Sequence, residues 1–97
     1  MEFYLGDVVK GRKQGNGILI NRKGNKYEGE FSNDVQNGKG FFDVLYPKRL
    51  YKGQWKNGKL EGYGEAQYED GAQYVGIFYQ GKKHGMGILT FVDGAVY

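Results

Sequence analysis

Cysteine is absent from this chain of 97 residues, and proline occurs only once. The missing cysteines exclude a disulfide scaffold, a thiolate metal site and a thiol nucleophile. Glycine occurs eighteen times, but a collagen helix is excluded because the glycines have no three-residue period and proline is almost missing. No charge-free apolar run approaches the roughly 20 residues that a membrane-spanning helix needs.

Side chains that perform catalysis are also scarce. Ser32, Thr90 and His84 are the only serine, threonine and histidine of the chain. Ser32 and His84 belong to different parts of the sequence, whereas a working serine–histidine pair must approach to about 3 Å. A lone histidine cannot build a zinc site where no cysteine is present. The sequence therefore indicates no enzyme, no cofactor and no bound metal.

Aromatic residues, by contrast, are abundant. The chain has nine Tyr, six Phe and one Trp, which is far too many for a disordered glycine linker. Its formal net charge is +3, from 14 basic and 11 acidic residues. A charge of this size is too small to indicate nucleic-acid binding by itself. The length allows one small domain.

The glycines follow a period that is marked by tyrosines. Tyr4, Tyr27, Tyr51 and Tyr74 are separated by 23, 24 and 23 residues, and Tyr97 follows after another 23. When each of the first four tyrosines is counted as offset 0, all eighteen glycines fall at offsets 2, 7, 11, 13 and 20. Self-similarity at this period indicates a tandem repeat array. The units of this single domain, residues 1–97, are residues 4–26, 27–50, 51–73 and 74–96, with Tyr97 opening an incomplete fifth unit.

The second unit departs from this frame. Asp34 stands at offset 7 and Pro47 at offset 20, where the other three units have glycine. One extra residue also lies near Lys48. We therefore expect a local irregularity at the join between the second and third units.

Within each unit the residues alternate as they do in β-strands. Tyr51, Gly53 and Trp55, at offsets 0, 2 and 4, show the pattern, which is the two-residue period of a strand with one marked face. Glycine near offsets 7 and 20 favours tight turns, because glycine adopts positive φ readily. The glycines inside strands leave room for aromatic rings to lie on the backbone. The sequence predicts an all-β fold, an elongated single-sheet solenoid of four consecutive antiparallel β-hairpins.

The pattern Tyr-x-Gly-x-(Trp/Phe)-x-x-Gly-x-x-x-Gly-x-Gly resembles the MORN repeat (membrane occupation and recognition nexus). Residues 51–64 fit it throughout, and the resemblance covers essentially the whole chain. It implies a β-hairpin solenoid that serves as a scaffold or binding module in cytoskeletal, ciliary or membrane-junction settings. The location that it implies is cytoplasmic and cytoskeleton-associated, near cilia or membranes.

The first functional hypothesis is a non-catalytic scaffold that binds a helical or extended protein segment. The in-phase aromatic residues would form a groove along the rod. These groove residues are Tyr27, Phe31, Tyr51, Trp55, Tyr74 and Phe78. The other face carries apolar patches in the first and fourth units, and a sheet that is apolar on both faces should be covered by something. The patches are Leu5, Val9, Ile18 and Ile20 in the first unit, and Val75, Ile77, Tyr79 and Ile88 in the fourth. Further parts of the same chain, a protein partner or face-to-face self-association could supply the cover.

The alternative is a peripheral membrane or phosphoinositide-binding module. Basic residues recur around the hairpin turns, and each could contribute up to about 1 kcal/mol near an anionic surface. They are Lys10, Arg12, Lys13, Lys56, Lys59, Lys82 and Lys83. Charged loops that serve only solubility explain the same pattern more simply. Nucleic-acid binding is not expected, because the net charge is weak and the aromatic residues are committed to packing.

The two ends of the array have no evident cap. Terminal units of a solenoid normally carry caps, and bare strand edges invite pairing with other strands. Three explanations stay open at this point: a longer array, cover by a partner, or end-to-end association of two copies.

Overall fold

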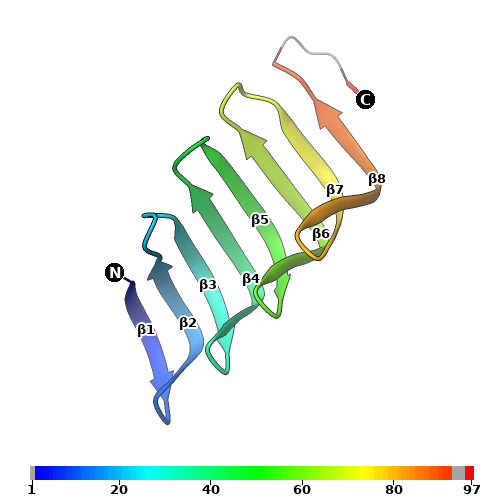
Figure 1. The fold of residues 1–97 in the computed structure, drawn as a ribbon. Helices are drawn as coiled ribbons and strands as arrows, with labels where there is room; N and C mark the ends of the chain where they lie inside the picture. The colour runs from blue at the N-terminus through cyan, green and yellow to red at the C-terminus, as the bar shows by residue number, and fades with distance from the viewer. Residues whose placement is uncertain (1, 93–95) are drawn as a thin grey trace.

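The computed structural model describes residues 2–92 and 96–97. The described residues form one sheet of eight antiparallel strands whose spatial order follows the sequence (Figure 1). The strands are β1 (Phe3–Val9), β2 (Arg12–Ile20), β3 (Lys26–Ser32), β4 (Val35–Val44), β5 (Arg49–Lys56), β6 (Lys59–Tyr68), β7 (Gln73–Tyr79) and β8 (Lys82–Thr90). No helix occurs among these residues, and so none that is long and apolar enough to cross a membrane. The predicted all-β array of consecutive hairpins is confirmed.

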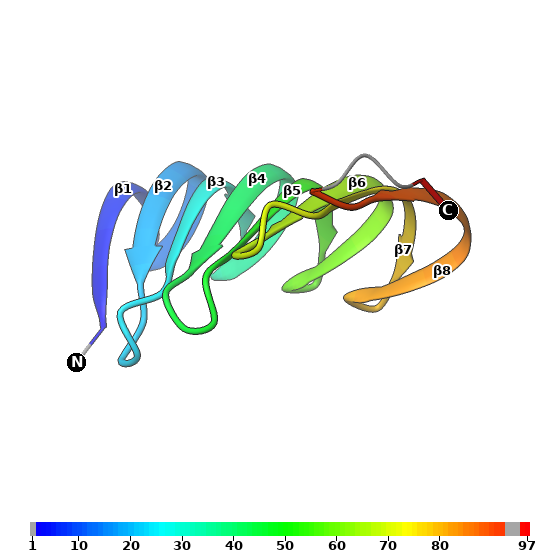
Figure 2. The ribbon, with the colours of Figure 1, turned by 90° about the horizontal axis from the view of Figure 1, so that it is seen from above.

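The hairpins stand side by side along an elongated molecule. Its principal dimensions are 49 × 24 × 16 Å. Hairpin turns line one rim of the sheet, and the turns that join successive units line the other (Figure 1). Seen from above, the strands arch from rim to rim, so that the sheet is curved like half of a cylinder (Figure 2).

Each hairpin closes with a two-residue turn in which both central residues have positive φ. The central pairs are Lys10–Gly11, Asn33–Asp34, Asn57–Gly58 and Gln80–Gly81. Two consecutive positive φ angles define a type I′ turn, whose twist matches that of the flanking strands. Asp34 adopts a φ of 73° without being glycine. Its carboxylate accepts a hydrogen bond of 2.8 Å from the backbone N–H of Lys13 in the first unit.

A bulge at the same place in every hairpin accompanies the arch. In the second unit Gly29 pairs with Gly40, but two residues later Phe31 pairs with Gln36. The second strand therefore uses four residues where the first strand uses two. The same register shift occurs in the other three hairpins. Bulges bend a strand and increase its twist, and so they provide the curvature of the sheet.

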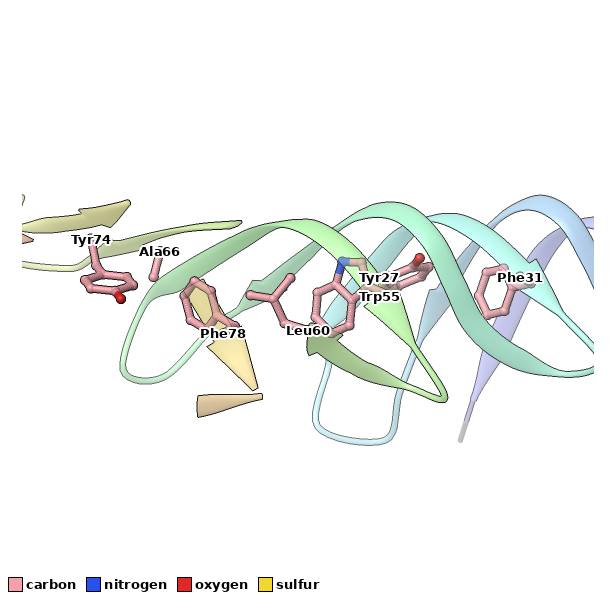
Figure 3. Packing of buried hydrophobic residues seen from close by; sticks show 7 residues of the cluster. All are labelled: Tyr27, Phe31, Trp55, Leu60, Ala66, Tyr74 and Phe78. Atoms are coloured by element: carbon pink, nitrogen blue, oxygen red, sulfur yellow. The ribbon is translucent and has the colours of Figure 1, made fainter. Parts of the chain in front are cut away.

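The inside of the arch holds an aromatic stripe, which consists of Tyr27, Phe31, Trp55, Tyr74 and Phe78 (Figure 3). The core cluster, at most 8% exposed, is Tyr27, Phe31, Trp55, Leu60, Ala66, Tyr74 and Phe78. Rings of neighbouring units meet edge to face, with 5.4 Å between the centroids of Tyr4 and Phe31 and 5.3 Å between those of Tyr27 and Trp55. Such pairs contribute about 0.5–1.5 kcal/mol each beyond their burial.

Glycine provides the room for these rings, as the sequence predicts. A Cβ atom at Gly40 would overlap the ring and hydroxyl group of Tyr27. The Tyr27 hydroxyl donates a hydrogen bond of 2.9 Å to the backbone carbonyl of Glu30. The first and fourth units repeat both the overlap with glycine and the hydroxyl bond.

The third unit is the exception, although its sequence fits the repeat throughout. Leu60 replaces the Lys or Gln of the other units at offset 9. Its Cδ1 atom lies 3.2 Å from the place that a Cβ of Gly53 would take, where the other units have the tyrosine hydroxyl. Tyr51 is only partly buried, and its hydroxyl accepts a hydrogen bond of 3.4 Å from Arg49.

The join between the second and third units differs from the others in its turn. The Tyr46–Pro47 peptide bond is cis. The pairing of β4 with β5 continues without a register shift from Val44–Arg49 to Gly38–Trp55. The expected irregularity is therefore confined to the turn.

Candidate interaction surfaces

The structure brings the six predicted groove residues together, but it places them in the core. Tyr27, Phe31, Trp55, Tyr74 and Phe78 are between 1% and 8% exposed, and Tyr51 is partly buried. Their side chains are covered by one another and by the arched strands, so they present little surface to a partner. Direct partner binding by this stripe stays a prediction that the burial disfavours.

An open groove of about 870 Å³ lies on the face opposite the core and reaches from β1 to β6. Its floor is the backbone of glycines that face each other across the strands, as Gly29 faces Gly40. Leu5, Phe41 and Tyr63 on its walls are 62%, 46% and 61% exposed. The groove therefore combines a floor without side chains and walls that carry exposed apolar side chains.

Charges of both signs line the same groove. Its acidic residues are Glu28, Glu30 and Glu65, and its basic residues are Lys39 and Lys52. The Lys52 ammonium lies 5.7 Å from the centroid of the Phe41 ring, a distance at which a cation is attracted to the ring face. Exposed aromatic side chains with polar groups around them match the apolar core and polar rim of a protein interface. An anionic membrane surface instead attracts clusters of positive charge.

The predicted apolar patches lie at opposite ends of the sheet. One belongs to β1 and β2 and the other to β7 and β8. Leu5, Val9, Ile77, Tyr79 and Ile88 are 40–62% exposed, and Ile18, Ile20 and Val75 are partly buried. Only the first patch borders the groove, through Leu5 and Ile18. The two patches therefore do not form one surface.

Phe41 and Tyr63 extend the groove into the second and third units, and the sequence did not single them out. The third unit looks polar on this face, because Lys52, Gln54 and Glu65 stand at its offsets 1, 3 and 14. Tyr63 is at offset 12 and Phe41 at offset 14. A count of apolar residues at both offsets in all four units would have found them.

The predicted basic residues lie around the rim of hairpin turns. Lys10, Arg12, Lys56, Lys59 and Lys82 are exposed. Lys13 lies 3.9 Å from the Asp34 carboxylate and 5.5 Å from the Tyr4 ring centroid. The Lys83 ammonium lies 4.8 Å from the ring centroid of Tyr68. Two of the seven cations are thus engaged in contacts within the chain.

The titratable groups with displaced pKa values belong to the packing. Burial raises the pKa of the Tyr27 phenol to about 12, with a contribution from the charge of Glu30. Burial, with the nearby Asp7 and Asp34, also raises the pKa of Tyr4. Both hydroxyls donate to backbone carbonyls. Among the described residues, no three His, Asp or Glu side chains gather as metal ligands would.

Three relatives illustrate the similarity of this chain to known proteins. It is 33% identical over 90 residues to Alsin of Rattus norvegicus, an alignment that covers 89% of this chain and 6% of Alsin. It is 33% identical over 92 residues to the ALS2 C-terminal-like protein of Homo sapiens, covering 89% and 9%. It is 34% identical over 70 residues to MORN repeat-containing protein 3 of Xenopus laevis, covering 66% and 29%. The chain spans less than a third of the length of each.

The family model of the MORN repeat matches the chain four times. The matches are residues 4–26, 27–43, 51–73 and 74–96. The second match stops before the turn that contains Pro47, where the chain departs from the repeat pattern. The four matches cover most of the sequence, and each falls on one of the observed hairpins. This chain belongs to the MORN repeat family.

Proposed function

We propose that this chain is a non-catalytic module that binds a protein segment in the groove opposite its aromatic core. MORN repeats generally serve in protein or lipid interactions. The groove reaches from β1 to β6, and exposed apolar side chains stand on its walls. Its occupant is an extended or helical segment with apolar side chains and charges of both signs.

One observation carries the proposal: Phe41 and Tyr63 stand exposed beside a floor of glycine backbone. Exposed apolar patches of this kind mark interaction surfaces. The floor is bare backbone on this side, because the Cβ positions of these glycines point toward the core. The walls also carry three glutamates and two lysines, which would pair with opposite charges on the segment and fix its orientation.

The test uses a charged double variant and a matched control. Phe41→Glu with Tyr63→Glu alters the groove without touching the core. Met86→Glu is the control, since Met86 occupies offset 12 of the fourth unit, as Tyr63 does in the third, and is 86% exposed outside the groove. Partner retention from native extract should fall about tenfold or more in the double variant and stay unchanged in the control, because aromatic anchors dominate interfaces.

Site-specific photo-crosslinking then locates the contact. A photoreactive phenylalanine at position 41 or 63 should capture the protein that the wild type retains, and one at position 86 should not. Equal retention by wild type and the folded double variant would contradict the proposal. Capture from position 86 alone would contradict it as well.

Anionic-membrane binding is the second candidate, and the exposure of five basic residues along the hairpin-turn rim favours it. Sedimentation with vesicles that contain or lack phosphatidylserine tests it. Lys56→Gln, Lys59→Gln and Lys82→Gln together should weaken binding about fivefold per charge removed, since each is worth about 1 kcal/mol. Arg22→Gln, Lys23→Gln and Lys26→Gln on the other rim form the control. Sedimentation that is independent of phosphatidylserine and of salt would eliminate this candidate.

We also propose a cytoplasmic, cytoskeleton-associated location, near cilia or membranes. Its support is membership of the MORN family together with an architecture suited to scaffolding. After detergent extraction of cells, the chain should stay with the insoluble cytoskeleton. Complete release with the soluble fraction would argue for another location.

A further inference from the structure

Successive units of the sheet join in one constant register. The residue at offset 15 of each unit pairs with the anchor tyrosine of the next. These pairs are Leu19–Tyr27, Phe42–Tyr51 and Ala66–Tyr74. Two residues after each of these tyrosines, a glycine faces a glycine of the preceding unit, as Gly29 faces Gly17. In the described residues, successive units therefore pair in the same register at all three joins.

A backbone hydrogen bond outside the ladders repeats with the same regularity. An N–H of each following hairpin turn donates to the carbonyl at offset 9 of the unit before. The bonds are Asp34 to Lys13 at 3.0 Å, Gly58 to Gln36 at 3.0 Å and Gly81 to Leu60 at 2.9 Å. The fourth carbonyl of this series is that of Lys83, on β8.

Tyr97 shows that β8 accepts a further strand in this register. It exchanges two backbone hydrogen bonds, of 2.8 and 2.9 Å, with Leu89. Leu89 is the offset 15 residue of the fourth unit, so this pair repeats the three earlier joins. Among the described residues, the stretch of β8 from Lys82 to Ile88 pairs with β7 alone. Its outer edge therefore presents the backbone groups to which another unit would bind.

The strand β1 has the features that this edge requires. It carries Tyr4 and Gly6 at offsets 0 and 2, as β3, β5 and β7 carry tyrosine and glycine. Within the described sheet it pairs only with β2. In the common register, Gly6 of a second copy would face Gly87, and its Leu5 would face Ile88. Leu5 and Ile88 are 62% and 56% exposed, and an apolar cross-strand pair stabilises a sheet.

We propose that β8 of one copy pairs with β1 of a second copy, so that the sheet continues head to tail through the interface. The second copy's Tyr4 takes the place of Tyr97 opposite Leu89, and its Gly11 N–H reaches the Lys83 carbonyl. Association thus displaces Val96 and Tyr97 from β8. Because this contact is heterologous, it produces chains of copies rather than a closed dimer. It does not depend on the function of the groove.

The absence of cysteine allows a test by disulfide formation. Leu5→Cys and Ile88→Cys are prepared separately, mixed and oxidised gently. In the proposed register their Cβ atoms stand about 4.5–5.5 Å apart, close to the geometry of a disulfide. The mixture should form the crossed disulfide about tenfold or more faster than either preparation alone, because pairing raises the effective concentration of the thiols.

Leu5→Cys mixed with Met86→Cys is the matched control, since Met86 lies on the same strand and face but two residues out of register. It should react slowly. Equal rates for Ile88→Cys and Met86→Cys overturn the proposal, and so does a dominant disulfide between two Leu5→Cys copies. A variant that ends at residue 95 should show a higher mean mass in light scattering, since the competing residues are gone. An unchanged or lower mass overturns the displacement of Tyr97.

Discussion

The smallest structural part of this protein is a tyrosine ring that lies on a glycine backbone. Tyr27 covers Gly40 and bonds through its hydroxyl to the Glu30 carbonyl. The ring is 1% exposed, which it could not be if the glycine carried a side chain. The abundance of glycine thus follows from packing, although glycine inside a strand usually weakens it.

Gly40→Ala should destabilise the fold by about 3 kcal/mol, because the new methyl group must displace the Tyr27 ring. Gly62→Ala is the matched comparison. Nothing lies within 4 Å of a Cβ at Gly62, and only its φ of +85° opposes the change, which costs about 1 kcal/mol. Urea unfolding of the two variants measures the difference. A smaller loss for Gly40→Ala than for Gly62→Ala would show that the ring does not depend on the glycine.

Alkaline pH should weaken the fold through the same tyrosine. The phenol of the unfolded chain loses its proton near pH 10, whereas the folded state raises the pKa of Tyr27 to about 12. The folded state therefore holds the proton more tightly, and its stabilisation is complete below pH 10. Stability then falls by about 1.4 kcal/mol per pH unit between pH 10 and 12.

Tyr27→Phe removes this titrating group and should reduce the alkaline fall. Its stability at neutral pH should be lower by about 1 kcal/mol, because the hydrogen bond to the Glu30 carbonyl is lost. Unfolding by urea at a series of pH values measures both effects. A variant with the same alkaline loss as the wild type would assign that loss to other groups.

At the scale of the hairpin, the sequence predicted the strands and turns well because glycine marks both. The bulge was not predicted, since no single residue type marks it. Nor was the position of Tyr51 predicted, which fits the repeat but is only partly buried. The bulge places Leu60 opposite Trp55, and from there the Leu60 side chain takes the space beside Gly53 that the tyrosine hydroxyl occupies in the other units. The Phe78 ring lies beside Gly64, where the Tyr51 ring would lie. That competition depends on register, which the repeat pattern does not show.

The turn of the second hairpin gives a prediction at this scale. Asp34 adopts a φ of 73° and accepts a hydrogen bond from the Lys13 N–H. Asp34→Ala should cost about 2 kcal/mol, since it keeps the strain and loses the bond. Asp34→Gly should be nearly neutral, because relief of the strain offsets the lost bond. Thermal unfolding compares the two, and equal losses would mean that the strain at this position is unimportant.

At the scale of the whole molecule, the aromatic side chains on the two faces of the sheet differ in burial. The sequence predicted one aromatic face and elongated growth, because both follow from the period of 23 or 24 residues. It did not show that the arch encloses the aromatic face, since this depends on bulges in every hairpin. The predicted binding stripe is consequently the core, and the exposed apolar side chains of the groove lie on the other face.

This division between a structural face and a proposed binding face is tested most directly by the unfolding free energies of Trp55→Ala and Tyr63→Ala. Trp55 is 8% exposed and Tyr63 is 61% exposed, and both are large aromatic residues of the third unit. Trp55→Ala should lose about 3–5 kcal/mol, as buried aromatic truncations do, and Tyr63→Ala should change by about 0.5 kcal/mol or less. Equal losses, or a larger loss for Tyr63→Ala, would contradict the assignment of the aromatic stripe as the core.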